Sequence, residues 1–387
     1  MKASVIGLGK LGLPVAEAMA RHHQVMGTDI RPVAVDRVRL GTLEQVVAHG
    51  DIIFIAVQTP HDPQYDGSAP TSHLPSRDFD YSTVIHVLDK LEKLDIDGKI
   101  IALISTVLPG TMRRQLAQHI SRVNLVYNPY LIAMGTVAHD MVNPEMIMIG
   151  TATGRDASAI ETLTSFYAPL MQNSPRIVTG TWEEIECTKI FYNTFISAKL
   201  SLVNMIQDVA ERVGNMDADT VARALAESTQ RITGPAYMKP GMGDGGPCHP
   251  RDNIALRWLS EKLRLGYDLF DSIMRAREVQ AENLARELVS HGLPVIILGK
   301  SFKPGVSYTD GSYSLLVAHY CEQLGSSVDY DQILSKPATY LLGHQRYYTT
   351  ELAEMAQGSV VVDPWRSTQV PDGIMLIAYG NTRELVD

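Results

Sequence analysis

The sequence predicts an α/β fold with one α/β domain at each end of the chain and a long central helix between them. Short β-branched runs alternate with helical stretches in the first third, which is typical of a parallel sheet with covering helices. A long helical pattern begins near Trp182, and a second alternation begins near Leu293. The length of 387 residues agrees, because about 150 residues per domain gives two to three domains.

The strands of the first domain are expected where short apolar runs are bounded by turn or charged residues. No such run exceeds five or six residues, so each fits a buried strand. The six predicted strands are Ala3–Ile6, Gln24–Thr28, Ile52–Val57, Ile100–Ser105, Leu125–Tyr127 and Met146–Ile149.

The central region is predicted to be helical, with one helix from Trp182 to Val213 whose apolar residues recur at near-helical spacing. Because it is apolar on more than one side, we expect it to connect the domains and to form a dimer surface. Further helices are expected at Asp217–Glu227, Pro250–Leu263 and Asp268–Ser290. We therefore predict three parts: residues 1–180, 181–290 and 291–387.

Composition and charge exclude several classes of protein. Lys and Arg number 34 and Asp and Glu number 43, and the formal net charge of −9 argues against nucleic acid as a partner. The apolar runs are too short to span a membrane, and we expect no targeting segment. The three cysteines, Cys187, Cys248 and Cys321, are odd in number and widely spaced. They indicate neither a disulfide framework nor a metal site, so we expect a cytoplasmic protein.

The segment Gly7–Gly12 predicts a dinucleotide site, because it follows a strand and opens a helix. Gly7 permits the tight turn, Gly9 lets the backbone approach a pyrophosphate, and Gly12 lets the helix pack on the strand. Asp29 ends the second strand, where a carboxylate accepts ribose hydroxyls and repels a 2′-phosphate. We therefore expect a Rossmann-type domain that binds NAD rather than NADP, although Arg31 could serve a phosphate.

Cys248 is the candidate nucleophile, because flanking glycines leave it uncrowded. His249 and Arg251 favour its thiolate, whereas Asp244 and Asp252 oppose it. The other two cysteines lie in apolar helical stretches, where a free cysteine is usually a small core residue.

Lys189 and Asn193 are four residues apart on the central helix and so share a face. Together they would hold and deprotonate a substrate hydroxyl; by themselves they would more often be a solvated pair. No histidine arrangement indicates a metal site.

Taken together, these motifs resemble the UDP-glucose/GDP-mannose dehydrogenase family over nearly the whole chain. Beyond the glycine loop, the matching segments are Val57–Pro60, Ser105–Thr111, Lys189 with Asn193, Arg231 with Ile232, Gly241–Asp252 and Leu298–Gly305. The resemblance implies oxidation of a sugar primary alcohol to a carboxylate with two NAD, in a homodimer. It makes the three predicted parts an NAD-binding domain, a central dimerisation domain with the cysteine loop, and a nucleotide-substrate-binding domain.

The resemblance also implies roles for single residues. The catalytic set is Cys248, Lys189, Asn193, Asp252 and Thr106. The cofactor-binding set is Gly7, Gly9, Lys10, Leu11, Gly12, Asp29, Val57, Thr59, Pro60, Ser105 and Thr106. The substrate-binding set is Tyr130, Lys189, Asn193, Arg231, Tyr237, Gly245, His249 and Lys303.

The departures from the family pattern lie at the substrate side. Tyr130 and the residues after it replace a segment with two glutamates, the first of which is associated in the family with activating water against the thioester. Asp310 lies near the position of an expected arginine, where its charge would repel a diphosphate. Loss of a positioned general base typically costs about 10²–10⁴ in rate. Without this base the reaction would stall at the thioester unless another group, such as His249 or Asp244, took over the role. A changed substrate or a shortened reaction is therefore a real alternative.

Two other functions stay open. Lys189 with Asn193 on a long helix also resembles the 3-hydroxyacid dehydrogenases, which predicts two-electron oxidation of a secondary alcohol, either net or transient as in an epimerase. A non-catalytic paralogue that binds a nucleotide sugar is the third possibility. Cys248 in its glycine-rich loop argues against both.

Overall fold

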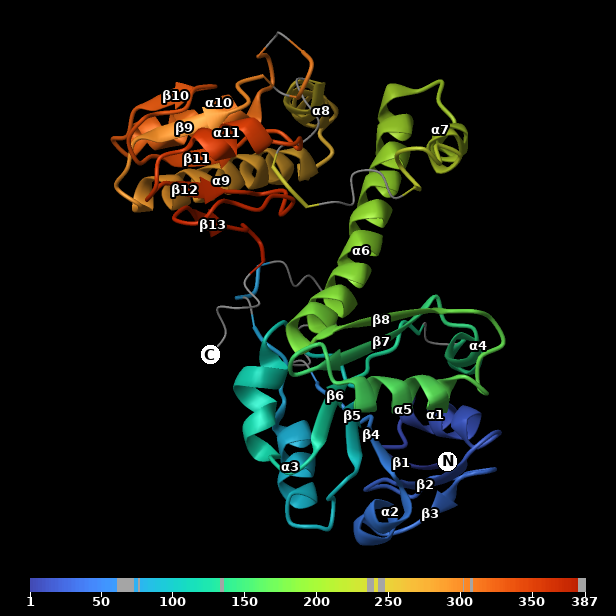
Figure 1. Cartoon of the computed structure of the whole chain (residues 1–387). Helices are drawn as coiled ribbons and strands as arrows, with labels where there is room; N and C mark the ends of the chain where they lie inside the picture. Colours follow the sequence, from blue (N-terminus) through green and yellow to red (C-terminus); the bar gives the residue numbers. More distant parts are fainter. Residues whose placement is uncertain are drawn as a thin grey trace. The chain divides into compact units, whose positions relative to one another are not determined.

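The computed structural model describes residues 1–60, 73–75, 77–132, 136–234, 240–242, 248–301, 303–306 and 309–381 (Figure 1). It divides into two compact units, Met1–Leu200 and Ser201–Asp387. The three-part division expected from the sequence stays a prediction.

The first unit is built on an eight-stranded sheet with the order β3-β2-β1-β4-β5-β6-β7-β8. The strands are β1 (Lys2–Ile6), β2 (Gln24–Thr28), β3 (Arg39–Leu40), β4 (Ile52–Ile55), β5 (Ile100–Leu103), β6 (Asn124–Tyr127), β7 (Met146–Thr151) and β8 (Arg176–Thr181). The order of the first six strands is that of a Rossmann fold, with β1 between β2 and β4 at the point where the order reverses.

The sheet is not wholly parallel, which corrects the sequence prediction for β7. This strand pairs antiparallel with β6 and parallel with β8. The sequence reasoning also missed β3 and β8. The reason is that β3 has two residues and β8 is largely exposed, so neither shows a buried apolar run.

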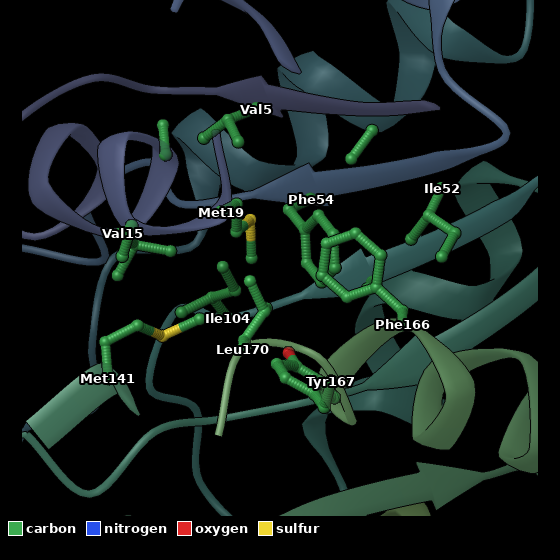
Figure 2. Packing of buried hydrophobic residues seen from close by; sticks show 14 of the residues in the cluster. Val5, Val15, Met19, Ile52, Phe54, Ile104, Met141, Phe166, Tyr167 and Leu170 are labelled. Atoms are coloured by element: carbon green, nitrogen blue, oxygen red, sulfur yellow. The ribbon is translucent and has the colours of Figure 1, made fainter. Parts of the chain in front are cut away.

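Helices cover both faces of this sheet (Figure 1). They are α1 (Gly12–Met19), α2 (Leu43–His49), α3 (Ser82–Leu91), α4 (Val137–Val142), α5 (Ala157–Tyr167), the π-helix η2 (Met112–Leu116), the 3₁₀ turn η3 (Ala117–His119) and the first part of α6 (Trp182–Val213). One core joins α1, α4 and α5 to one face, and the other joins α2, α3 and η2 to the opposite face. Figure 2 shows Phe54 of β4 and Phe166 of α5 meeting in the first core, with ring centroids 5.2 Å apart.

The second unit carries a five-stranded parallel sheet with the order β10-β9-β11-β12-β13. Its strands are β9 (Val295–Leu298), β10 (Val328–Tyr330), β11 (Thr339–Leu342), β12 (Val360–Val362) and β13 (Met375–Ile377). Its helices are the end of α6, then α7 (Ala218–Ala226), α8 (Cys248–Leu263), α9 (Leu269–Ser290), α10 (Tyr313–Gln323) and α11 (Thr349–Glu354). The C-terminal α/β domain predicted from the sequence is thus confirmed.

Element boundaries follow the apolar pattern closely. The predicted helix from Trp182 to Val213 is confirmed at both ends. Cys321 lies in the core between α9 and α10, as expected, and Cys187 is half-buried. In the described part of the chain, no helix is both long and apolar enough to cross a membrane.

Candidate active site

The glycine loop between β1 and α1 has the geometry of a dinucleotide site. Gly7 has φ +96°, and a Cβ there would lie 2.9 Å from the backbone of Ala56 and Val57. A Cβ on Gly12 would lie 1.9 Å from the Gly7 carbonyl oxygen, so helix and turn touch only because Gly12 has no side chain. A Cβ on Gly9, by contrast, would meet nothing within 4 Å. Two glycines therefore serve packing, and the third leaves the backbone open to a phosphate.

Asp29 follows β2 and links the glycine loop to the next turn. Its carboxylate accepts the Leu8 N–H at 2.7 Å and the Arg31 N–H at 2.9 Å. The Arg31 guanidinium lies 3.9 Å from this carboxylate and is largely exposed. Asp29 therefore stands at the end of the second strand, where a Rossmann acid binds the ribose.

The loops after β4 and β5 are joined to each other at the same sheet edge. The Ser105 hydroxyl donates to the Val57 carbonyl oxygen at 2.5 Å. The Thr59 hydroxyl donates to the Thr106 carbonyl oxygen at 2.8 Å. Since β1 and β4 are neighbours, these loops lie next to the glycine loop. The structure thus gathers most of the predicted cofactor residues at the switch point of the sheet, where ligands of such folds bind.

The remaining cofactor candidates flank this edge. Lys10 is exposed, and Leu11 packs partly against the core. Pro60 follows Thr59, and its carbonyl oxygen accepts the Asp80 N–H at 2.9 Å. The residues fit NAD, which would lie along the glycine loop with its ribose at Asp29.

Lys189 is a buried lysine on α6, and the residue as a whole is 8% exposed. No hydrogen bond or ion pair of its ammonium is found among the residues described. Burial without a compensating anion lowers the pKa of Lys189. Asn193, one turn further along α6, is exposed. Lys189 is therefore suited to accept a proton from an alcohol.

Glu186 lies one turn before Lys189 and is fully buried. Its carboxylate accepts the Gly110 N–H at 2.5 Å and the Met112 N–H at 2.7 Å. Burial raises the pKa of Glu186, although these two bonds oppose the shift. The sequence reasoning missed Glu186. It could have been found from its position, because it lies three residues before Lys189 and therefore on the same face of the helix. Glu186 fixes the loop that carries Ser105 and Thr106 to the helix that carries Lys189.

Tyr130 occupies the position where the resemblance leads one to expect a glutamate. Its hydroxyl lies 2.7 Å from that of Tyr167, which in turn donates to the side chain of Asn128. The Asn128 amide donates to the Met148 carbonyl oxygen at 2.6 Å. Burial raises the pKa of Tyr130. This hydroxyl takes part in a packed network instead of supplying a base, and its predicted contact with substrate stays a prediction.

The other candidates belong to the second unit. Cys248 is the first residue of α8, and its side chain and that of His249 lie outside the described part, as do Tyr237 and Gly245. Four other residues singled out in the sequence have described side chains, and all four are exposed. They are Arg231 in the turn after α7, Asp252 on α8, and Lys303 and Asp310 after β9.

A cavity of about 370 Å³ opens where the strand order of the second sheet reverses. It is lined by Gly299, Lys300, Thr309, Asp331, His344 and Arg346, among others. Asp331 follows β10 and accepts the Gly299 N–H at 2.6 Å and the Lys300 N–H at 3.3 Å. This contact repeats that of Asp29 with the glycine loop of the first unit. The sequence reasoning missed Asp331, because the strand before it has three residues.

Comparison with known proteins adds independent information. The NAD binding domain model of the UDP-glucose/GDP-mannose dehydrogenase family matches residues 40–171, and its central domain model matches residues 183–278. Together these matches span more than half of the chain. The first match begins after the glycine loop, so the assignment of that loop as a dinucleotide site depends on its geometry.

Curated relatives extend the likeness along the chain. UDP-glucose 6-dehydrogenase TuaD of Bacillus subtilis is 28% identical over 92% of this chain and 81% of its own length. GDP-mannose 6-dehydrogenase of Pseudomonas putida is 27% identical over 79% of this chain and 74% of its own. Among solved structures, a ternary complex of GDP-mannose dehydrogenase from Pseudomonas aeruginosa superposes with a TM-score of 0.81. It is 21% identical and covers 98% of this chain and 100% of its own, which shows a shared fold.

Proposed function

Because the chain belongs to the UDP-glucose/GDP-mannose dehydrogenase family, we propose that it oxidises the primary alcohol of a nucleotide sugar, or of a related nucleoside, through Cys248. It is an NAD-dependent dehydrogenase of CH–OH groups, and its first unit is a Rossmann-type NAD-binding domain. Cytoplasmic location stays a prediction.

The burial of Lys189 is the observation that best supports the proposed alcohol oxidation. Its burial without a partner among the described groups favours the neutral amine, which takes the proton of the substrate hydroxyl. Asn193, one turn away, would donate to the same oxygen. NAD, when bound at the glycine loop, accepts the hydride.

Cys248 would carry the second oxidation. Its sulfur adds to the aldehyde carbon and the carbonyl oxygen takes up a proton, which gives a thiohemiacetal. Loss of a hydride to a second NAD and of the hydroxyl proton leaves a thioester, and water then releases the carboxylic acid and the free thiol. The position of Cys248 at the first residue of α8 supports this role, because a helix N-terminus stabilises a nearby anion.

A two-electron outcome is the second candidate, and Tyr130 favours it. The hydroxyl of Tyr130 is bonded to Tyr167, so this position offers no carboxylate to activate water. A protein that cannot hydrolyse the thioester would stall at it, so sustained turnover would have to end before the thiol step, with release of an aldehyde after one NADH, or would oxidise a secondary alcohol instead.

The ratio of NADH to sugar consumed separates these functions. The purified protein is incubated with NAD and UDP-glucose, GDP-mannose or other nucleotide sugars. Two NADH per sugar with wild type, and at most one with Cys248→Ser, support the proposal. Cys187→Ser is the matched control and should behave as wild type, because Cys187 is half-buried on α6. A Cys248→Ser protein that still gives two NADH would exclude the covalent route.

We also propose that the chain forms a homodimer through α6. This helix leaves a set of large apolar side chains exposed: Phe191, Phe195, Ile196, Leu202 and Val203. Exposed apolar area of this kind marks interaction surfaces. Sedimentation velocity should give about 85 kDa for two 42.6 kDa chains, by simple doubling. Phe195→Asp should shift the mass to that of one chain; an unchanged dimer would place the interface elsewhere.

A further inference from the structure

We propose that Glu186 is a positioning residue for the alcohol oxidation, because its carboxylate joins the helix of Lys189 to the loop that carries Ser105 and Thr106. This loop follows β5 and comprises residues 105–112, named the β5 loop. The inference rests on the proposed function, in which Lys189 takes the proton and the β5 loop contacts the cofactor. All the contacts that support it lie within the first unit.

Lys189 lies where α6 leaves the core of the first unit. The residues of α6 before it that are buried recur at helical spacing and so form one face of the helix with it. This buried face consists of Trp182, Ile185, Glu186 and Lys189. Residues 193–199, further along the helix, are exposed. The position of the Lys189 amino group therefore depends on how the turns before it are attached to the first unit.

Glu186 is the residue of this face that binds the β5 loop. Its Oε2 accepts the Gly110 N–H at 2.5 Å, and its Oε1 accepts the Met112 N–H at 2.7 Å. Glu186, Gly110 and Met112 are all buried, so water offers these N–H groups no alternative partner. The two bonds therefore fix the separation between α6 and the end of the loop.

The β5 loop is held at its start and in its middle as well. Its start is joined to the loop after β4 by the hydrogen bonds of Ser105 and Thr106. In its middle, the buried Tyr81 before α3 accepts the Leu108 N–H at 3.3 Å with its hydroxyl. Because the loop is held at several points, it connects Glu186 rigidly to the two expected cofactor residues.

Two other polar contacts of this part of α6 run to different elements. The Trp182 indole donates to the Leu125 carbonyl oxygen on β6 at 3.1 Å. The Tyr192 hydroxyl, one turn after Lys189, donates to Glu145 before β7 at 3.0 Å. Neither contact reaches the β5 loop, so neither sets the distance between that loop and the lysine.

Glu183 also joins α6 to the end of the loop, but in a more exposed place. It pairs with Arg113 at 2.5 Å, and 34% of each side chain is exposed. Ion pairs that water reaches contribute little. Glu183 also lies six residues before Lys189, whereas Glu186 lies three before it. Glu183 is therefore a matched control for Glu186.

The separation of α6 and the β5 loop matters for the first oxidation. The substrate alcohol gives its proton to Lys189 and its hydride to NAD, so both acceptors have to stand beside the same carbon and oxygen at once. A displacement of about 1 Å of a reacting group can cost on the order of 10²-fold in rate. NAD binding should change less, because the glycine loop and Asp29 hold the cofactor from other elements. A merely structural role for Glu186 would lower stability and leave the rate of the folded protein unchanged.

The test compares two variants of Glu186 with Glu183→Gln and Tyr192→Phe, at a temperature where circular dichroism shows each to be folded. We expect Glu186→Leu to slow the first NADH-forming step in stopped-flow measurements by about 10–100-fold. Glu186→Gln keeps one acceptor and should slow this step by about three- to tenfold. The Kd of NAD by calorimetry should change by less than about threefold in both.

Both controls should match wild type in this step. A wild-type rate in folded Glu186→Leu, or equal slowing in Tyr192→Phe, would overturn the proposal. Should Glu186→Leu not fold, Glu186→Gln decides the question alone, and a wild-type rate in that variant has the same consequence.

A readout without turnover separates this proposal from the proposed function. Reductive methylation needs an accessible neutral amine, and Lys189 is buried. The rate of Lys189 methylation by formaldehyde and dimethylamine–borane, followed by peptide mass spectrometry, should rise about fivefold in the Glu186 variants, because local opening exposes the amine. It should stay unchanged in Glu183→Gln. If no nucleotide sugar is oxidised, the proposed function fails, and this rate still tests the contact. Methylation at the wild-type rate in both Glu186 variants would show that Glu186 does not hold Lys189 in place.

Discussion

Replacing Glu186 with glutamine should weaken the first unit by removing one acceptor from a buried pair of hydrogen bonds. The carboxylate accepts N–H groups of Gly110 and Met112, whereas an amide keeps one acceptor and turns an NH₂ group toward the other N–H. A hydrogen bond to a charged group contributes about 1.5–3 kcal/mol. The glutamine carries no charge, so its burial costs less, and this offsets part of the lost hydrogen-bond energy. We therefore expect Glu186→Gln to lower the free energy of unfolding by about 1–3 kcal/mol.

Glu186→Ala should cost more, because it leaves both buried N–H groups without an acceptor. At about 1–3 kcal/mol for each unsatisfied donor, the expected loss is about 2–6 kcal/mol. Glu183→Gln is the matched control on the same helix. Glu183 pairs with Arg113 at 2.5 Å, but about a third of its side chain is exposed (34%), so we expect no more than about 1 kcal/mol.

Urea unfolding followed by circular dichroism measures these differences, and the pH dependence adds a signed test. Burial raises the pKa of Glu186 above 4.5, so the folded chain holds this proton more tightly than the unfolded chain does. Wild type therefore loses this stability as the pH rises from 4.5 through the raised pKa, and Glu186→Gln lacks that slope. An unfolding midpoint of Glu186→Gln equal to that of wild type, or a larger loss in Glu183→Gln, would refute the reasoning.

The remaining predictions concern the cofactor loop and the buried lysine. Gly9→Ala should fold with wild-type stability yet bind NAD at least about tenfold more weakly by calorimetry, because its methyl group meets only the space where a pyrophosphate would lie. Gly12→Ala should instead lower the melting temperature, because its methyl group would overlap the Gly7 carbonyl; the opposite pattern would reverse these two roles. Lys189→Met should lower the rate of the first NADH-forming step by about 10²–10⁴ while the fold is kept. Because burial lowers the pKa of Lys189, wild type should gain stability as the pH rises from this pKa to 10.5, and a Lys189→Met protein with the same gain would contradict the assignment.

The elements that local sequence signals specify were predictable. Apolar runs marked β1, β2, β4, β5 and β6, and helical spacing marked α6 from end to end. The sequence did not reveal β3, which has only two residues, or β8, which is largely exposed. The direction of β7 also escaped prediction, because strand direction depends on the connection after β6 and leaves no mark in the strand's own residues.

For the site, the sequence alone determined which residue types stand at the glycine loop, at Lys189 and at Cys248. Their local conformations follow from short-range sterics, as for the positive φ of Gly7. Only the tertiary structure decided the contact that holds the helix of Lys189 to the loop after β5: Glu186 with Gly110, 76 residues away. Such pairs form because buried or constrained N–H and C=O groups need partners wherever the fold brings them, and sequence spacing carries no record of that choice.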